Sequence, residues 1–111
     1  MPINTENELR LPDGRRLGYA SYGPDDGWPV LFFHGIPGSR HSSHSAGVVG
    51  ESHGARVIAF DRPGYGLSDP LPGREIHDWP RDVVDALDVL SIERFSVFGY
   101  SGGGPFGLAT A

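Results

Sequence analysis

Short apolar runs, separated by polar and glycine-rich segments, divide this chain into strands and helices. Three runs are largely apolar, at residues 29–33, 56–60 and 94–98. A run without strict alternation is typical of a strand that is buried on both faces, as in a parallel sheet. We therefore predict three buried strands over these ranges.

Ahead of the first run, apolar positions alternate with polar or small ones in residues 8–11 and again in residues 16–22. Between the two segments lies Pro-Asp-Gly, at residues 12–14. Proline fixes φ and glycine accepts a positive φ, which is typical of a tight turn. The pattern predicts an antiparallel hairpin.

Helical periodicity is strong in residues 78–90 and weaker elsewhere. Asp78 is expected to cap this helix, and Pro80 is compatible with its first turn. A weaker helix is predicted over residues 39–52, because the glycines in this segment lower helix propensity. A third helix is expected from Gly102 onward. The core-facing side of the strong helix is expected to hold Trp79, Val83, Leu87 and Leu90, and its solvent side Asp82, Asp85 and Asp88.

The resulting order is β-β-β-α-β-α-β-α. It predicts an α/β fold in which a hairpin is followed by a mostly parallel sheet with helices on both faces. In such sheets, chemistry collects at the carboxyl ends of the strands. The loops at residues 34–40, 61–69 and 99–103 each follow a predicted buried strand, so we expect them to converge on one crevice.

Length and composition limit the possible function. The 111 residues are enough for one small domain, and the absence of cysteine excludes disulfides and thiolate metal sites. A net charge of −5 disfavours nucleic acid as a partner. No apolar stretch is long enough to span a membrane, and residues 1–13 do not resemble a signal peptide, so a cytoplasmic location is predicted.

The strongest chemical signal is the G-x-S-x-G pattern formed by Gly99, Tyr100, Ser101, Gly102 and Gly103. A serine at a sharp turn from strand to helix has a strained backbone, and its hydroxyl is held out at the edge of the sheet. The two outer glycines leave room for the neighbouring strand and helix, while the start of the helix offers backbone N–H groups to an oxyanion. An incidental serine in a glycine-rich turn is the alternative interpretation of this pattern alone.

Other candidate sites are weaker. His41 and His44 are three residues apart without a third ligand at a sensible spacing, so we expect a solvated face and neither a metal nor a cofactor. His53 is expected to meet the last carbonyls of a helix, and His77 to be exposed. Trp79 is expected in the core rather than at a substrate. A nucleotide-binding domain is disfavoured because neither a G-x-G-x-x-G after the first buried strand nor a G-K-[ST] occurs.

Three motifs, at residues 34–39 (HGIPGS), 61–68 (DRPGYGLS) and 99–103 (GYSGG), resemble the N-terminal half of the α/β-hydrolase superfamily. The resemblance runs from about Leu9 to the end of the chain. It implies a hydrolase that acts on a small molecule with an ester, amide or similar carbonyl bond. Peptidases, esterases, C–C bond hydrolases, perhydrolases and lactonases share this branch. The similar epoxide hydrolases and dehalogenases carry aspartate at the nucleophile position, so Ser101 argues against those two.

The resemblance also assigns roles to single residues. Ser101 would be the nucleophile that forms an acyl-enzyme, and the backbone N–H groups of Ile36 and Gly102 would form the oxyanion hole. The remaining motif residues would have supporting roles: His34, Gly35, Asp61 and Arg62 in fixing the loops, and Gly99, Tyr100 and Gly103 in shaping the nucleophile elbow.

The chain departs from the family after Ser101. In the family, the acid and the histidine of the catalytic triad follow the serine, whereas this chain ends at Ala111 and all of its histidines precede Ser101. We therefore expect residues 1–111 to be a partial α/β-hydrolase domain, truncated after the nucleophile elbow. The alternative is a catalytically inactive fragment or an interaction module. The strand before Ser101 would have an open edge, where self-association or a complementing chain is expected.

Overall fold

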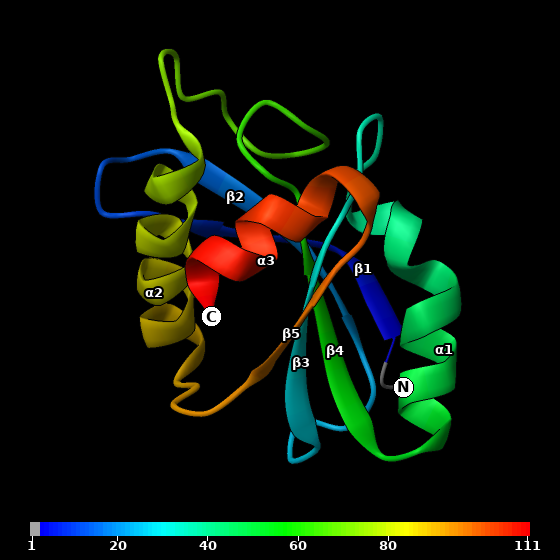
Figure 1. Ribbon diagram of the computed structural model, residues 1–111. Helices are drawn as coiled ribbons and strands as arrows, with labels where there is room; N and C mark the ends of the chain where they lie inside the picture. Colours follow the sequence, from blue (N-terminus) through cyan, green and yellow to red (C-terminus); the bar gives the residue numbers. More distant parts are fainter. Residues whose placement is uncertain (1–2) are drawn as a thin grey trace.

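The computed structural model describes residues 3–111, so the first two residues of the segment examined for a signal peptide lie outside the described residues. One sheet lies between helices on both of its faces (Figure 1). The strands are β1 (Ile3–Arg10), β2 (Arg16–Tyr22), β3 (Trp28–Phe33), β4 (Ala55–Phe60) and β5 (Ser96–Gly99). The helices are α1 (His44–Ser52), α2 (Trp79–Leu90) and α3 (Gly104–Thr110), preceded by the 3₁₀ turns η1 (Arg40–Ser43), η2 (Ile76–Asp78) and η3 (Ser101–Gly103). None of these helices is long and apolar enough to cross a membrane.

The strands of the sheet lie in the order β1-β2-β4-β3-β5. β2 pairs antiparallel with both β1 and β4, and β3 pairs parallel with both β4 and β5. In this register Leu31 of β3 lies opposite Ile58 of β4 and Val97 of β5. The predicted α/β fold, with a hairpin that leads into parallel strands, is confirmed, and β1 and β5 form the two edges of the sheet.

The two faces of the sheet have separate cores. On one face, Trp79 of α2 is 2% exposed and packs edge-to-face against Phe33, with ring centroids 5.4 Å apart, so its predicted place in the core is confirmed. On the other face, Gly47 allows α1 to lie close to the sheet, because a Cβ at this position would overlap the ring of Tyr22. The same glycine that weakens helix propensity therefore allows the helix to pack.

Two acidic residues of the α2 region differ from their predicted roles. Asp82 was expected on the solvent side, but it is buried and binds the guanidinium of Arg15 at 2.7 and 3.1 Å. Asp78 occupies the N-cap position of α2 without capping it, because its carboxylate accepts the N–H of Glu75 at 2.7 Å and closes the preceding 3₁₀ turn. Pro80 lies in the first turn of α2, as expected.

The edge strands also differ from prediction. β1 begins at Ile3, earlier than the predicted start at residue 8, because its polar first half still pairs with β2. β5 was expected to be a buried strand over residues 94–98, but it is shorter and mostly exposed, because it has a neighbour on one side only. The predicted helix over residues 39–52 divides into η1 and α1.

Candidate functional site

Three loops meet at the carboxyl ends of β3, β4 and β5, at the top of the sheet in Figure 1. The N–H of Tyr100 donates to the carbonyl of Phe33 at 3.1 Å, which joins the third loop to the first. The N–H of Arg62 donates to Nε2 of His34 at 3.1 Å, which joins the second loop to the first. The predicted meeting of the loops is confirmed, but of their residues only Gly99 lines any of four hollows found among the described residues.

Ser101 stands at the turn between β5 and η3. Its φ is +51°, and Ser91 is the one other non-glycine residue with a positive φ in the part of the chain that the structure describes. This conformation costs an L-residue about 1–2 kcal/mol. The side chain is exposed, and within residues 3–111 its hydroxyl makes no hydrogen bond to another side chain or to the backbone. The strained, outward-facing serine expected from the motif is therefore present.

The outer glycines of the elbow are required by close backbone contacts. A Cβ added at Gly99 would lie 2.7 Å from the carbonyl oxygen of Gly103, and one added at Gly103 would overlap the carbonyl of Phe33. Any larger residue at either position would push the strand and the following turn apart. The G-x-S-x-G spacing thus has the physical reason that the sequence suggested.

The turn that carries Ile36 lies against the turn that carries Ser101 and Gly102. A Cβ added at Gly102 would be 3.3 Å from the nitrogen of Ile36, and one added at Gly35 would be 3.3 Å from Cβ of Ser101. Neither N–H donates to a protein acceptor within the described residues. Two backbone donors without acceptors near an exposed serine are compatible with the oxyanion hole that the resemblance implies, which stays a prediction.

His34 is fully buried, and both of its ring nitrogens are bonded. Because the backbone N–H of Arg62 can only donate, Nε2 is the unprotonated nitrogen, and Nδ1 carries the hydrogen that it donates to the carbonyl of Gly35 at 2.8 Å. Burial lowers the pKa of His34 from its ordinary value and so favours the neutral ring. A ring held in this way has no free lone pair with which to accept a proton from Ser101.

The bond from His34 also orients the oxyanion donor. The carbonyl of Gly35 and the N–H of Ile36 belong to one planar trans peptide group, so they point in opposite directions. Holding the carbonyl on the His34 side therefore directs the N–H away from it. His34 lies where a brace for the loop would lie, as the resemblance implied.

Arg62 is a fully buried cation beneath the loops. Its Nη2 donates to the carbonyl of His34 at 2.7 Å, and its guanidinium carbon lies 4.2 Å from the ring centroid of Phe106 in α3 and 5.3 Å from that of Tyr65. Burial lowers its pKa. Nε and Nη1 have no partner within the described residues, so aromatic faces take the place of a carboxylate. Arg62 thus connects the first loop to the helix that follows Ser101.

Asp61 joins the same loops through its buried carboxylate. It accepts hydrogen bonds from the backbone N–H and Nη1 of Arg40, the latter at 2.8 Å, and from the N–H of Leu67 at 2.9 Å. Arg40 continues outward and pairs with Glu6 of β1 at 2.9 Å. Sequence reasoning missed Arg40, because nothing in its neighbourhood distinguishes it from a surface arginine.

A second supporting residue that was missed is Ser68. Its hydroxyl donates to the carbonyl of Asp61 at 2.6 Å and accepts the N–H of Gly18 in β2 at 2.9 Å. The signal was available, because Ser68 ends the second motif. Its hydrogen bonds tie that loop to the hairpin.

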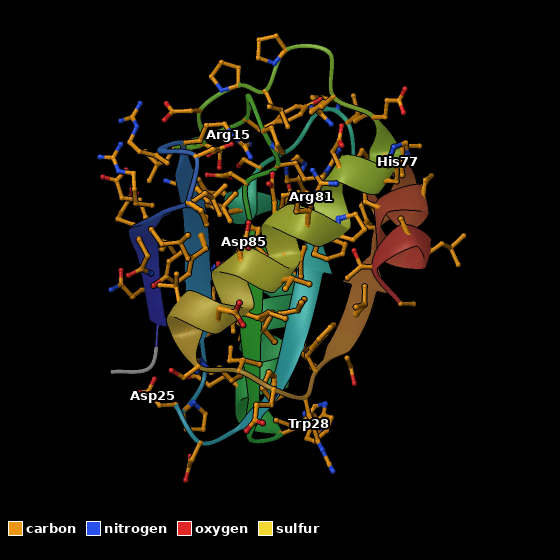
Figure 2. All side chains as sticks on the ribbon, turned by 90° about the vertical axis from the view of Figure 1, so that its left-hand side faces the viewer. Arg15, Asp25, Trp28, His77, Arg81 and Asp85 are labelled. Carbon is orange, nitrogen blue, oxygen red and sulfur yellow. The ribbon has the colours of Figure 1, made fainter. Side chains whose placement is uncertain are left out.

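The remaining histidines lie away from this network. His41 and His44 are exposed, and within residues 3–111 there is no group of three His, Asp or Glu side chains that could hold a metal ion. Nδ1 of His53 lies 2.9 Å from the carbonyl of Val49 at the end of α1, as expected. His77 is exposed at the start of α2 (Figure 2), also as expected.

Comparison with known proteins gives related sequences along most of this chain. The family model described as alpha/beta hydrolase fold matches residues 29–111. A non-heme chloroperoxidase of Streptomyces lividans is 39% identical over 93 residues, which cover 83% of this chain and 34% of the relative. A haloalkane dehalogenase of Psychrobacter cryohalolentis is 34% identical over 96 residues, which cover 84% of this chain and 32% of the relative.

The fold comparison agrees with the sequence comparison. The esterase EaEST of Exiguobacterium antarcticum superposes with a TM-score of 0.83 at 24% identity, covering 95% of this chain and 39% of the esterase. At that identity the likeness shows the fold alone. The chain spans about a third of the length of the curated relatives that it matches.

Proposed function

Because the chain belongs to the α/β-hydrolase fold family, we propose that it is a serine hydrolase that cleaves an ester, amide or similar carbonyl bond of a small molecule through an acyl-enzyme at Ser101. The observation that carries the proposal is an exposed serine at positive φ beside two N–H groups without acceptors. The named relatives include a chloroperoxidase and a dehalogenase, so the family alone does not select a reaction. A serine in the elbow favours acyl transfer.

In the proposed reaction, Oγ of Ser101 attacks the carbonyl carbon of the substrate while its proton passes to a base. The N–H groups of Ile36 and Gly102 bind the resulting oxyanion, and one such donor typically lowers the activation free energy by about 3 kcal/mol. The tetrahedral intermediate then expels the leaving group, which takes up the proton. Water hydrolyses the acyl-enzyme and regenerates Ser101.

The proposal requires a base that residues 3–111 do not place at Ser101. His34 does not serve, because Nε2 accepts the N–H of Arg62 and Nδ1 donates to Gly35. A serine without a base is a weak nucleophile at neutral pH. The second candidate function is a catalytically inactive interaction module built on the same fold.

A serine-directed fluorophosphonate, applied to the protein as purified from its natural source, distinguishes the two functions. Intact-mass measurement shows first whether the product is heavier than the 11.9 kDa of this sequence. We expect labelling of the wild type and of Ser91→Ala, which changes the other serine with a positive φ, but not of Ser101→Ala. Equal labelling of the wild type and both variants, or no labelling of the wild type, would contradict the hydrolase and support the interaction module.

A further inference from the structure

The first of the three loops, which carries the predicted oxyanion donor Ile36, is held at both ends by two neighbouring residues of opposite charge. At its start, Nη2 of Arg62 donates to the carbonyl of His34 at 2.7 Å. At its end, the carboxylate of Asp61 accepts the backbone N–H of Arg40 and, at 2.8 Å, its Nη1. Two adjacent residues of the second loop thus fix both ends of the first.

Close contacts lead from the end of this loop back to the predicted donor. A Cβ added at Gly38 would be 2.7 Å from the carbonyl oxygen of Gly35 and 3.0 Å from Oγ of Ser42. That carbonyl belongs to the same planar peptide group as the N–H of Ile36. The hydroxyl of Ser42 also accepts the N–H of Ser39 at 3.1 Å. Because these groups are in contact, a shift at the end of the loop would move the peptide group that carries the donor.

The Asp61 carboxylate at this end of the loop is tightly enclosed. A Cβ added at Gly18 would be 2.6 Å from its Oδ2, and one added at Gly66 would overlap the carboxylate. Within residues 3–111, Arg40 is the one cation paired with it. A buried charge without a partner is costly, so the two side chains stay together and fix this end of the loop.

Two further contacts hold the side chain of Arg40 itself. Its Nε donates to the carbonyl of Thr5 at 2.6 Å, and its Nη2 donates to the carboxylate of Glu6 at 2.9 Å. Both acceptors belong to β1, so the planar guanidinium bonds to a strand and to the second loop at the same time. A lysine carries its charge at a single point and does not reproduce this fork of donors.

We propose that Arg40 is a positioning residue for the acylation of Ser101, which holds the first loop, through Asp61, so that the N–H of Ile36 faces the oxyanion. The inference rests on the proposed function. Arg40 is buried, and in the described part of the chain it hydrogen-bonds to neither Ser101 nor Ile36, so it acts through the loop and not on the reacting atoms. A misplacement of about 1 Å lowers an enzymatic rate by about 100-fold.

The kinetics of fluorophosphonate labelling test the inference, with variants made in the full natural product and Ser101→Ala as the blank. Two constants are measured: kinact, the labelling rate at saturating probe, and KI, the probe concentration that gives half of this rate. We expect Arg40→Ala to lower kinact by roughly tenfold to 100-fold and Arg40→Lys to lower it by roughly threefold to tenfold. KI should stay within about twofold, because the donor acts in the transition state. A merely structural role would reduce the fraction of protein that becomes labelled, not kinact.

The matched control is a second arginine–aspartate pair with little exposure, in which Nη2 of Arg15 lies 2.7 Å from Oδ1 of Asp82. Arg15 comes from the turn between β1 and β2 (Figure 2), and among the described residues its side chain donates only to Asp13 and Asp82. We expect Arg15→Ala and Arg15→Lys to destabilise the fold but to leave kinact within about twofold of the wild-type value, because the pair is independent of the loops.

The possible outcomes separate this inference from the proposed function. If the wild type and both Arg40 variants were labelled with the same kinact, the inference would be overturned while the hydrolase stood. The same holds if the Arg15 variants lost as much in kinact as the Arg40 variants. Should Arg40→Ala not fold, the comparison of Arg40→Lys with Arg15→Lys decides in the same way. No labelling of the wild type would contradict the hydrolase itself, and this inference with it.

Discussion

The loops behind the candidate site and the turn that carries Ser101 are built in opposite ways. His34, Asp61 and Arg62 are fully buried, and they tie the loops at residues 34–40 and 61–69 together through hydrogen bonds to backbone and side-chain atoms. Ser101 is exposed at a strained φ, and its hydroxyl makes no hydrogen bond within the described residues. We therefore expect the loops to contribute stability and the turn to carry the proposed reactivity. Substitutions in the two regions should change the free energy of unfolding in opposite directions.

The largest effect is expected from Asp61→Ala. It removes the partner of buried Arg40 and the acceptor of two backbone N–H groups. Breaking a buried ion pair from one side typically costs about 3–5 kcal/mol in the free energy of unfolding. Urea denaturation measures this loss. Asp61→Asn, which keeps the shape of the side chain, is the milder variant to use if Asp61→Ala does not fold.

The control for this prediction is Asp69→Ala. Asp69 also pairs with an arginine, Arg16, at 2.8 Å, but both side chains reach solvent. Exposed pairs contribute little to stability. Equal losses for Asp61→Ala and Asp69→Ala would show that the buried network does not anchor the loops.

A smaller effect of opposite sign is expected at the strained turn. Ser101→Gly relieves the positive φ, so we expect the free energy of unfolding to rise by about 0.5–1 kcal/mol after the entropic cost of glycine. Ser91→Gly, at the left-handed C-cap of α2, should stabilise the protein by a similar amount. Ser101→Ala keeps the strain and should give no gain. If Ser101→Gly were no more stable than Ser101→Ala, the turn would not be strained in solution.

Much of this arrangement was predictable from the sequence, because the apolar residues of buried strands and helices recur with a regular spacing. The apolar runs located β3 and β4 to within one residue, and the helical spacing located α2. Two of the failures share a cause, namely partners distant in sequence. The sequence pattern predicts that Asp82 is exposed, but in the folded chain Arg15 pairs with it. The exposure of β5 depends on its place in the strand order.

In the candidate site, too, local features were predictable from the sequence, whereas features that depend on distant residues were not. The three motifs located the loops and identified Ser101, because glycines and prolines in a short segment are enough to indicate a turn. They did not identify the role of Arg40, which depends on Asp61 lying 21 positions further along the chain. They also could not specify which nitrogen of His34 carries its hydrogen, because that follows from the N–H of Arg62.

The smallest expected effect is a pH dependence that arises from His34. Its pKa in the folded protein lies below the ordinary value of 6.5, because burial disfavours the charged ring. Between these two values the unfolded chain binds a proton that the folded chain does not, so stability is full above pH 6.5 and falls as the pH drops toward the folded pKa.

The variant His34→Asn tests this pH dependence. Its side-chain amide is able to donate to the carbonyl of Gly35 but does not titrate, so this part of the pH dependence should vanish. His77→Asn changes an exposed histidine and should keep it. Urea midpoints measured at several pH values compare the three proteins. A wild-type profile identical to that of His34→Asn would mean that His34 is not held neutral, and the argument that it orients the N–H of Ile36 through a single tautomer would then fail.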